Sequence, residues 1–91
     1  MSADPFIRID TLGGNCPVQA EGEIGGVPFY FRARGESWSM SIGGDDIYLA
    51  PDWHYDEPYG EEEYAAGWMP LYEALGFMAQ AFGLYANREA A

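Results

Sequence analysis

The sequence predicts an α+β fold, a five-stranded antiparallel β-meander with a C-terminal helix packed on one face. Apolar and polar residues alternate with period two over the first fifty residues, which is typical of strands with one buried face. Glycine-containing turns separate the alternating runs. An apolar pattern of helical spacing follows Pro70. Because 91 residues amount to the length of one domain, residues 1–91 are expected to form a single domain.

The five strands are expected where the alternation is clearest, at residues 7–11, 18–24, 27–34, 37–42 and 47–49. A two-residue turn at Gly25-Gly26 pairs Ile24 with Val27 and puts the apolar positions of both strands on one face. In the other hairpins, the register that keeps this face apolar makes these pairings: Ile9 with Ala20, Thr11 with Val18, Ala33 with Trp38, Phe31 with Met40, Ile42 with Ile47 and Met40 with Leu49.

The C-terminal helix is expected to follow Pro70, since proline suits the first helical position. We expect Gly76 and Gly83 to let this helix lie close to the sheet or to a second subunit. A shorter helix is expected near Glu61, where consecutive glutamates favour a helix N-terminus. Residues 51–60 between sheet and helix are expected to form a loop. The apolar face of the main helix is expected to contain Leu71, Leu75, Met78, Phe82 and Tyr85.

The chain is strongly acidic, with 15 Asp and Glu against four Arg and no Lys, and a net charge of −11. This charge disfavours direct binding to nucleic acid or to an anionic membrane, because both need cations on the protein. It favours a basic partner. A single cysteine, Cys16, excludes an intrachain disulfide. The N-terminus lacks a signal-peptide pattern and no apolar stretch is long enough to span a bilayer, so a cytoplasmic location is expected.

The acidic residues concentrate between residues 45 and 63, where eight carboxylates and no basic residue occur. Crowded like charges oppose folding, so we interpret this region as a partner-binding surface rather than as a merely solubilising one. Carboxylates at i and i+2 on a strand stand about 6.6–6.8 Å apart, a multiple of the roughly 3.4 Å phosphate rise of DNA. The expected binding residues are Asp45, Asp46, Asp52, Trp53, Tyr55, Asp56, Glu57, Tyr59, Glu61, Glu62 and Glu63.

Aromatic residues interleave with these acids, as in interface hot spots. We expect Tyr55 and Tyr59 to be exposed, and Trp53 and Tyr64 to pack in the core. The glycines before Asp45 are explained by a turn between two strands.

Little in the sequence points to catalysis. His54 and Asp56 could form a general base, but the serines at 37, 39 and 41 occupy the polar side of a strand and Cys16 lies beside no identified base. The acidic residues have no calcium-loop spacing. We therefore expect a protein that is not an enzyme and that uses no cofactor and no metal.

With its single short domain, its lack of Lys and its acidic and aromatic cluster from Asp45 to Glu63, the chain resembles the small anti-CRISPR proteins of phages and mobile elements. The resemblance concerns those directed at type I CRISPR–Cas complexes. It is one of whole-chain character and involves no shared motif. It implies a non-enzymatic DNA mimic in the host bacterial cytoplasm that binds a basic Cas subunit and blocks target DNA.

Two alternatives remain open from the residues. An immunity or antitoxin protein that neutralises a basic nuclease toxin would use the same acidic surface. A homo-oligomer would use Phe77, Ala81 and Leu84 as a seam. A monomer is favoured over a homodimer.

Overall fold

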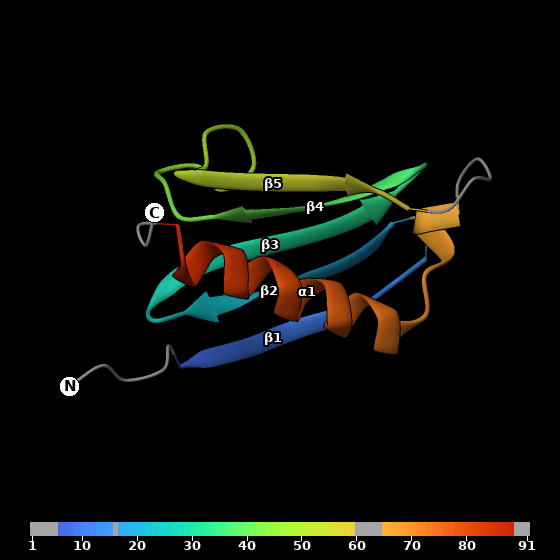
Figure 1. The fold of residues 1–91 in the computed structure, drawn as a ribbon, viewed down its shortest axis with the longest axis horizontal. Coiled ribbons are helices and arrows are strands. Elements are labelled where there is room, and N and C mark those ends of the chain that lie inside the picture. The colour runs from blue at the N-terminus through green and yellow to red at the C-terminus, as the bar shows by residue number, and fades with distance from the viewer. Residues whose placement is uncertain (1–5, 16, 60–64, 89–91) are drawn as a thin grey trace.

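A computed structural model describes residues 6–15, 17–59 and 65–88. It is an α+β fold, in which a five-stranded antiparallel sheet of order β1-β2-β3-β4-β5 is crossed on one face by helix α1 (Figure 1). The predicted fold class is therefore confirmed. The elements are β1 (Ile7–Gly13), β2 (Val18–Ile24), β3 (Val27–Arg34), β4 (Ser37–Ile42), β5 (Trp53–Pro58), the 3-10 turn η1 (Ala65–Trp68) and α1 (Leu71–Ala86).

The three central strands pair as the sequence predicts. Gly25 and Gly26, with φ angles of 58° and 83°, form the β2–β3 turn, which pairs Ile24 with Val27. Glycine adopts such angles without steric penalty, so the turn fixes the register. The β3–β4 hairpin pairs as predicted too. One face of these strands is therefore buried, through Val18, Ala20, Ile24, Phe29, Phe31, Ala33, Trp38, Met40 and Ile42.

The predicted position of the fifth strand is wrong. Residues 47–49 lie in a turn, and β5 comes from the segment that was expected to be a loop. Ile42 pairs with Trp53, and Met40 pairs with Tyr55. The larger aromatic side chains cover more of the core than Ile47 and Leu49 would, which favours this pairing. Proline at the end of an edge strand interrupts no interior ladder.

The predicted register of β1 is also wrong. Ile9 pairs with Gly22 rather than with Ala20, and a register shift leaves Asp10 in a β-bulge. The bulge brings the backbone oxygen of Arg8 against Gly22, where a Cβ atom would clash with it. The absence of a side chain at Gly22 therefore permits this close approach of the two strands.

Helix α1 follows Pro70 as predicted, but a different face is buried. Met78 and Phe82 are buried as expected, and Tyr85 is half-buried, whereas Leu71 and Leu75 are 46% and 43% exposed. Their places in the core are taken by the two small residues Ala74 and Ala81. Small side chains let the helix backbone lie close to the aromatic layer on the sheet.

The aromatic side chains of α1 contact β3, β4 and β5. Phe82 meets Phe29 edge to face with ring centroids 4.9 Å apart, and Phe77 stacks on Trp38 at 5.2 Å. Of the three residues considered above for a dimer seam, Ala81 is buried, Phe77 is half-buried against the core and Leu84 is 42% exposed.

Two other expectations about the helices fail or fall outside the described residues. A Cβ atom at Gly76 or Gly83 would have no neighbour within 4 Å, so these glycines do not provide a close approach to the sheet. Beyond the expected start of the shorter helix, the structure has the 3-10 turn η1, whose Ala66 N–H donates to the oxygen of Gly35 at 3.0 Å. The expected start of that helix at Glu61 lies outside the described residues.

Candidate functional site

The predicted acidic residues that the structure describes lie in the edge strand β5 and in the loop that leads to it. Asp45, Asp46 and Asp52 lie in the β4–β5 loop, and Asp56 and Glu57 lie in β5, the last strand of the sheet (Figure 1). We call these five residues the acidic edge. A six-residue strand is about 20 Å long at about 3.3 Å per residue. Glu61, Glu62 and Glu63 lie outside the described residues.

The strand does not present its two carboxylates in a row. The side chain of Asp56 is 67% exposed on the face opposite α1, whereas Glu57 is half-buried on the helix side. The neighbours of Asp56 at i−2 and i+2 are His54 and Pro58. The predicted i, i+2 spacing of carboxylates is therefore absent from β5, and any row of charges must combine the loop with the strand.

The acidic edge has no arginine counter-charge. All four arginines of the chain are among the described residues, and none forms an ion pair with these five carboxylates. Arg8 pairs with Asp10 at 2.8 Å and with Glu23 at 3.3 Å, at the opposite edge of the sheet. Within the part of the chain that the structure describes, the one nitrogen base that contacts them is the imidazole of His54, 3.3 Å from Asp56, so these carboxylates create a negative surface potential.

Two members of the acidic edge also hold the structure together. Glu57 accepts hydrogen bonds from the hydroxyl of Tyr55 and from Nε2 of Gln80 at 2.6 Å, which ties β5 to α1. Asp46 Oδ1 accepts from the backbone N–H groups of Tyr48 and Leu49 at 3.0 and 3.1 Å, which fixes the loop. The other three carboxylates, of Asp45, Asp52 and Asp56, belong to exposed residues.

The aromatic residues of this region pack inward more than the sequence predicts. Tyr55 and Tyr59, expected to be exposed, are half-buried against the core, as Trp53 is. Trp53 stacks on Tyr55 at 6.1 Å and meets Tyr85 edge to face at 5.5 Å. Tyr59 donates from its hydroxyl to Glu73 at 2.7 Å. Tyr64 lies outside the described residues.

The exposed aromatic residue at the acidic edge is Tyr48, which sequence analysis assigned to a strand. It is 60% exposed, and its ring meets Tyr30 edge to face at 5.0 Å. Its hydroxyl donates to Glu21 at 2.8 Å, which raises the pKa of Tyr48. These contacts fold the β4–β5 loop over the sheet face opposite α1. The turn residues at 43–46 were the available signal that the following segment was a loop.

The structure adds Ser41 to the pair of His54 and Asp56 that the sequence suggested. Ser41 Oγ lies 2.9 Å from His54 Nδ1, and His54 Nε2 lies 3.3 Å from Asp56 Oδ2. The order is that of a nucleophile, base and acid, but Ser41 is only 6% exposed. Ser41 and His54 are a register pair, so this contact joins β4 to β5.

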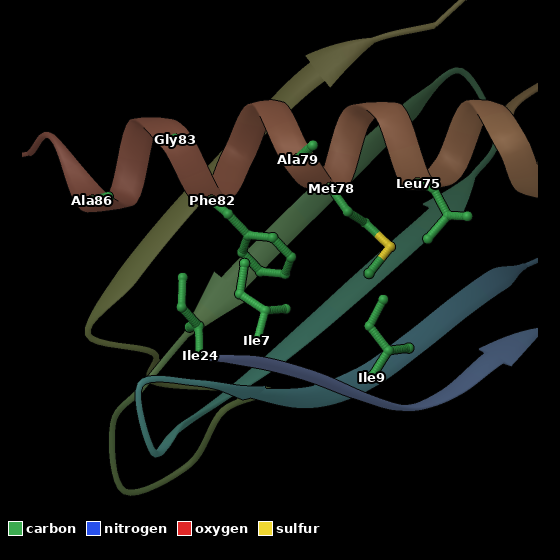
Figure 2. Close-up of a pocket in the computed structure, with 9 residues that line it drawn as sticks. All are labelled: Ile7, Ile9, Ile24, Leu75, Met78, Ala79, Phe82, Gly83 and Ala86. Carbon is green, nitrogen blue, oxygen red and sulfur yellow. The ribbon is translucent and has the colours of Figure 1, made fainter. Parts of the chain in front are cut away.

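An apolar groove between β1 and α1 is a second surface that the sequence did not predict. It has a volume of about 410 Å³, and Figure 2 shows Ile7 and Ile9 of β1 facing Met78 and Phe82 of α1 across it. Ile7 and Ile9 are each 40% exposed. The groove is open because the aromatic contacts of α1 are made with β3, β4 and β5 rather than with β1.

Within the described residues, no helix has the length and hydropathy needed to cross a membrane. In the same part of the chain, no three His, Cys, Asp or Glu side chains gather so as to hold a metal ion. No family model matches the chain, and comparisons with curated proteins and with solved structures find no match.

Proposed function

We propose that this protein inhibits a bacterial defence system by placing its acidic edge in a basic, DNA-binding groove of a type I CRISPR–Cas surveillance complex. There it takes the place of target DNA, with no chemical step. The observation that supports this function best is the acidic edge itself, whose carboxylates have no arginine counter-charge although the chain contains four arginines.

Electrostatics gives such a surface an affinity for nucleic-acid-binding proteins. Lys and Arg side chains that bind DNA phosphates displace counterions from the DNA, and the carboxylates of a protein can bind the same Lys and Arg side chains. Here the exposed carboxylate of β5, that of Asp56, acts together with those of Asp45 and Asp52 in the loop. Binding of this kind weakens as salt concentration rises.

The members of the acidic edge contribute differently to this binding. Asp45, Asp52 and Asp56 are exposed, so they meet the cations of the partner. Glu57 is held by Gln80 and acts mainly by keeping β5 in place. Tyr48 gives the loop an exposed ring, the kind of side chain that anchors interfaces.

The test is DNA capture by a purified type I surveillance complex, with and without this protein, at two salt concentrations. We expect the protein to prevent capture at low salt and to lose effect as salt rises. Unchanged capture at both concentrations would contradict the proposal for that complex. A basic nuclease toxin, the target of an immunity protein, is then the next partner to assay.

Two charge-reversal variants distinguish an effect of the acidic edge on inhibition from an effect of net charge. Asp56→Lys changes the exposed carboxylate of β5, and we expect it to weaken inhibition at least about tenfold, as for a lost charge-assisted contact. Glu23→Lys makes the same change in net charge on β2, three strands away, and should leave inhibition nearly intact. Equal losses in the two variants would show that overall charge, rather than the acidic edge, is responsible.

A further inference from the structure

The sheet face opposite α1 has a polar groove at the β3–β4 hairpin. It has a volume of about 360 Å³ and is lined by Arg32, Arg34, Gly35, Ser37 and Ser39. Arg32 pairs with Ser39 in the strand register, and Arg34 pairs with Ser37. Each arginine thus has a serine directly across from it on the same face of the sheet.

The charges in this groove are unusual for so acidic a chain. Residues two apart on a strand stand about 6.6–6.8 Å apart, so Arg32 and Arg34 place two positive charges side by side. Among the described residues, no carboxylate forms an ion pair with either arginine. The Nε atom of Arg32 is buried and makes no hydrogen bond there. Like charges without a counter-ion repel each other, so this arrangement favours a bound anion.

The carboxylates that lie nearest on this face are engaged with other groups. Glu21, diagonal to Arg32 across the β2–β3 pair, accepts a hydrogen bond from the hydroxyl of Tyr48 at 2.8 Å. Asp56, which pairs with Ser39 from the far side, contacts His54 at 3.3 Å. The two arginines therefore remain available to a ligand from solution.

We propose that this groove binds a phosphate group, independently of the acidic edge. A guanidinium presents planar, forked donors that match phosphate oxygens, and a tetrahedral anion has enough oxygens to accept from both arginines and a serine hydroxyl. A carboxylate, with two oxygens, fits one arginine and leaves the other without a partner. At physiological salt, charges more than about 8 Å away are largely screened, so the net charge of the chain does not exclude an anion here.

The test is a nuclear magnetic resonance titration that follows the Nε–Hε signals of Arg32 and Arg34 and the amide signals of Ser37 and Ser39. Burial of the Arg32 Nε atom slows exchange of its proton with water, which makes this signal observable. Inorganic phosphate, a nucleoside monophosphate and acetate are added separately at constant ionic strength, with chloride as the reference anion. We expect saturable shifts with both phosphates and weaker ones with acetate. Tighter binding of the monophosphate would identify the source as a phosphorylated molecule rather than free phosphate.

Matched variants locate the binding. Arg34→Gln removes an exposed guanidinium and should weaken phosphate binding about tenfold, as for a lost charge-assisted hydrogen bond. Arg32→Gln should also weaken phosphate binding about tenfold. The amide spectrum of this variant, compared with that of the parent, shows whether the fold is kept. Arg88→Gln makes an equal charge change at a guanidinium that lies 3.8 Å from the ring centroid of Tyr85, and should bind phosphate as the parent does. Shifts that chloride reproduces, or that persist in both groove variants, would overturn the proposal.

Discussion

At the scale of single residues, three tyrosine hydroxyls donate hydrogen bonds to glutamate carboxylates. The chain has no Lys, and three of its glutamates instead accept hydrogen bonds from phenols. Each bond stabilises the protonated tyrosine beside a negative charge and so raises the pKa of the phenol. The three pairs are Tyr48 with Glu21, Tyr55 with Glu57 and Tyr59 with Glu73.

These pairs predict a loss of stability in alkali. The pKa of Tyr59 is raised in the folded chain, mainly by its hydrogen bond to Glu73, so the unfolded chain loses this proton first, at about pH 10. The stabilisation is therefore complete below about pH 10 and is lost as pH rises through the raised pKa. Urea unfolding at pH 9.5 and pH 11 measures it. Tyr59→Phe should reduce the difference in the free energy of unfolding between these two pH values.

The contact between Ser41 and His54 predicts an asymmetric effect of mutation. His54→Ala leaves a hydroxyl that is 6% exposed without its partner, which should lower the free energy of unfolding by about 1–3 kcal/mol. Ser41→Ala removes the buried hydroxyl and leaves the exposed imidazole to water, so it should cost less. Urea unfolding of both variants tests this order. Equal losses would mean that the imidazole stabilises through some contact other than Ser41.

At the scale of elements, the sequence predicted those parts of the fold that short turns specify. The glycine turns set the register of β2, β3 and β4, because a slip of one residue would move every apolar side chain to the other face. The segment that forms β5 contains acidic residues and lies between Pro51 and Pro58, which are features typical of a loop. Its alternation of half-buried and exposed residues was therefore not recognised as a strand. The consequence for the candidate site was large, since β5 carries Asp56 and Glu57 on opposite faces.

The bulge in β1 and the rotation of α1 could not be predicted from apolar spacing alone. The bulge depends on a close approach of two backbones, at Arg8 and Gly22, which no side-chain pattern records. The rotation of α1 depends on volume, because Ala74 fits between helix and sheet where Leu71 or Leu75 would not. The polar groove at the β3–β4 hairpin was missed because the alternation indicates which face of the sheet Arg32 and Arg34 occupy but not which groups they contact.

Two glycine substitutions test this account of the elements. Gly22→Ala places a Cβ atom against the backbone oxygen of Arg8 and 2.8 Å from Cε2 of Phe29, so it should cost about 1–3 kcal/mol or more and disrupt β1. Gly76→Ala meets nothing within 4 Å on the exposed side of α1 and should stabilise the protein by up to about 1 kcal/mol. Thermal unfolding measures both changes. Destabilisation by Gly76→Ala would mean that α1 packs closer than the structure indicates.

At the scale of the whole molecule, the five carboxylates of the acidic edge form no ion pair with an arginine. Arg8 lies at the β1 edge, Arg32 and Arg34 lie on β3, and none of them reaches the acidic edge beyond β4. A net charge of −11 on a 10.1 kDa chain also opposes association of two copies, although the groove between β1 and α1 is apolar. We therefore expect a monomer, and light scattering at physiological salt should give the mass of one chain.

The same repulsion predicts that salt stabilises the fold. Two like charges about 10 Å apart repel by about 0.4 kcal/mol in water, so several such pairs along the acidic edge sum to about 1 kcal/mol or more. Raising sodium chloride from about 0.02 to about 0.5 M screens this repulsion and should raise the free energy of unfolding. Chloride is preferred to sulfate, which would also strengthen apolar burial.

A pair of charge-removing variants shows where the repulsion lies. Asp45→Asn removes a carboxylate that has no arginine partner, so it should raise stability at low salt and reduce the salt effect. Glu23→Gln removes one that lies 3.3 Å from Arg8 and should lower stability slightly or leave it unchanged. If Asp45→Asn instead destabilises the chain, the carboxylates of the acidic edge support folding. Their presence would then be explained by stability alone, without a binding partner. If Asp45→Asn stabilises the chain, the chain carries a surface that opposes its own folding, as expected of charges that bind a basic partner.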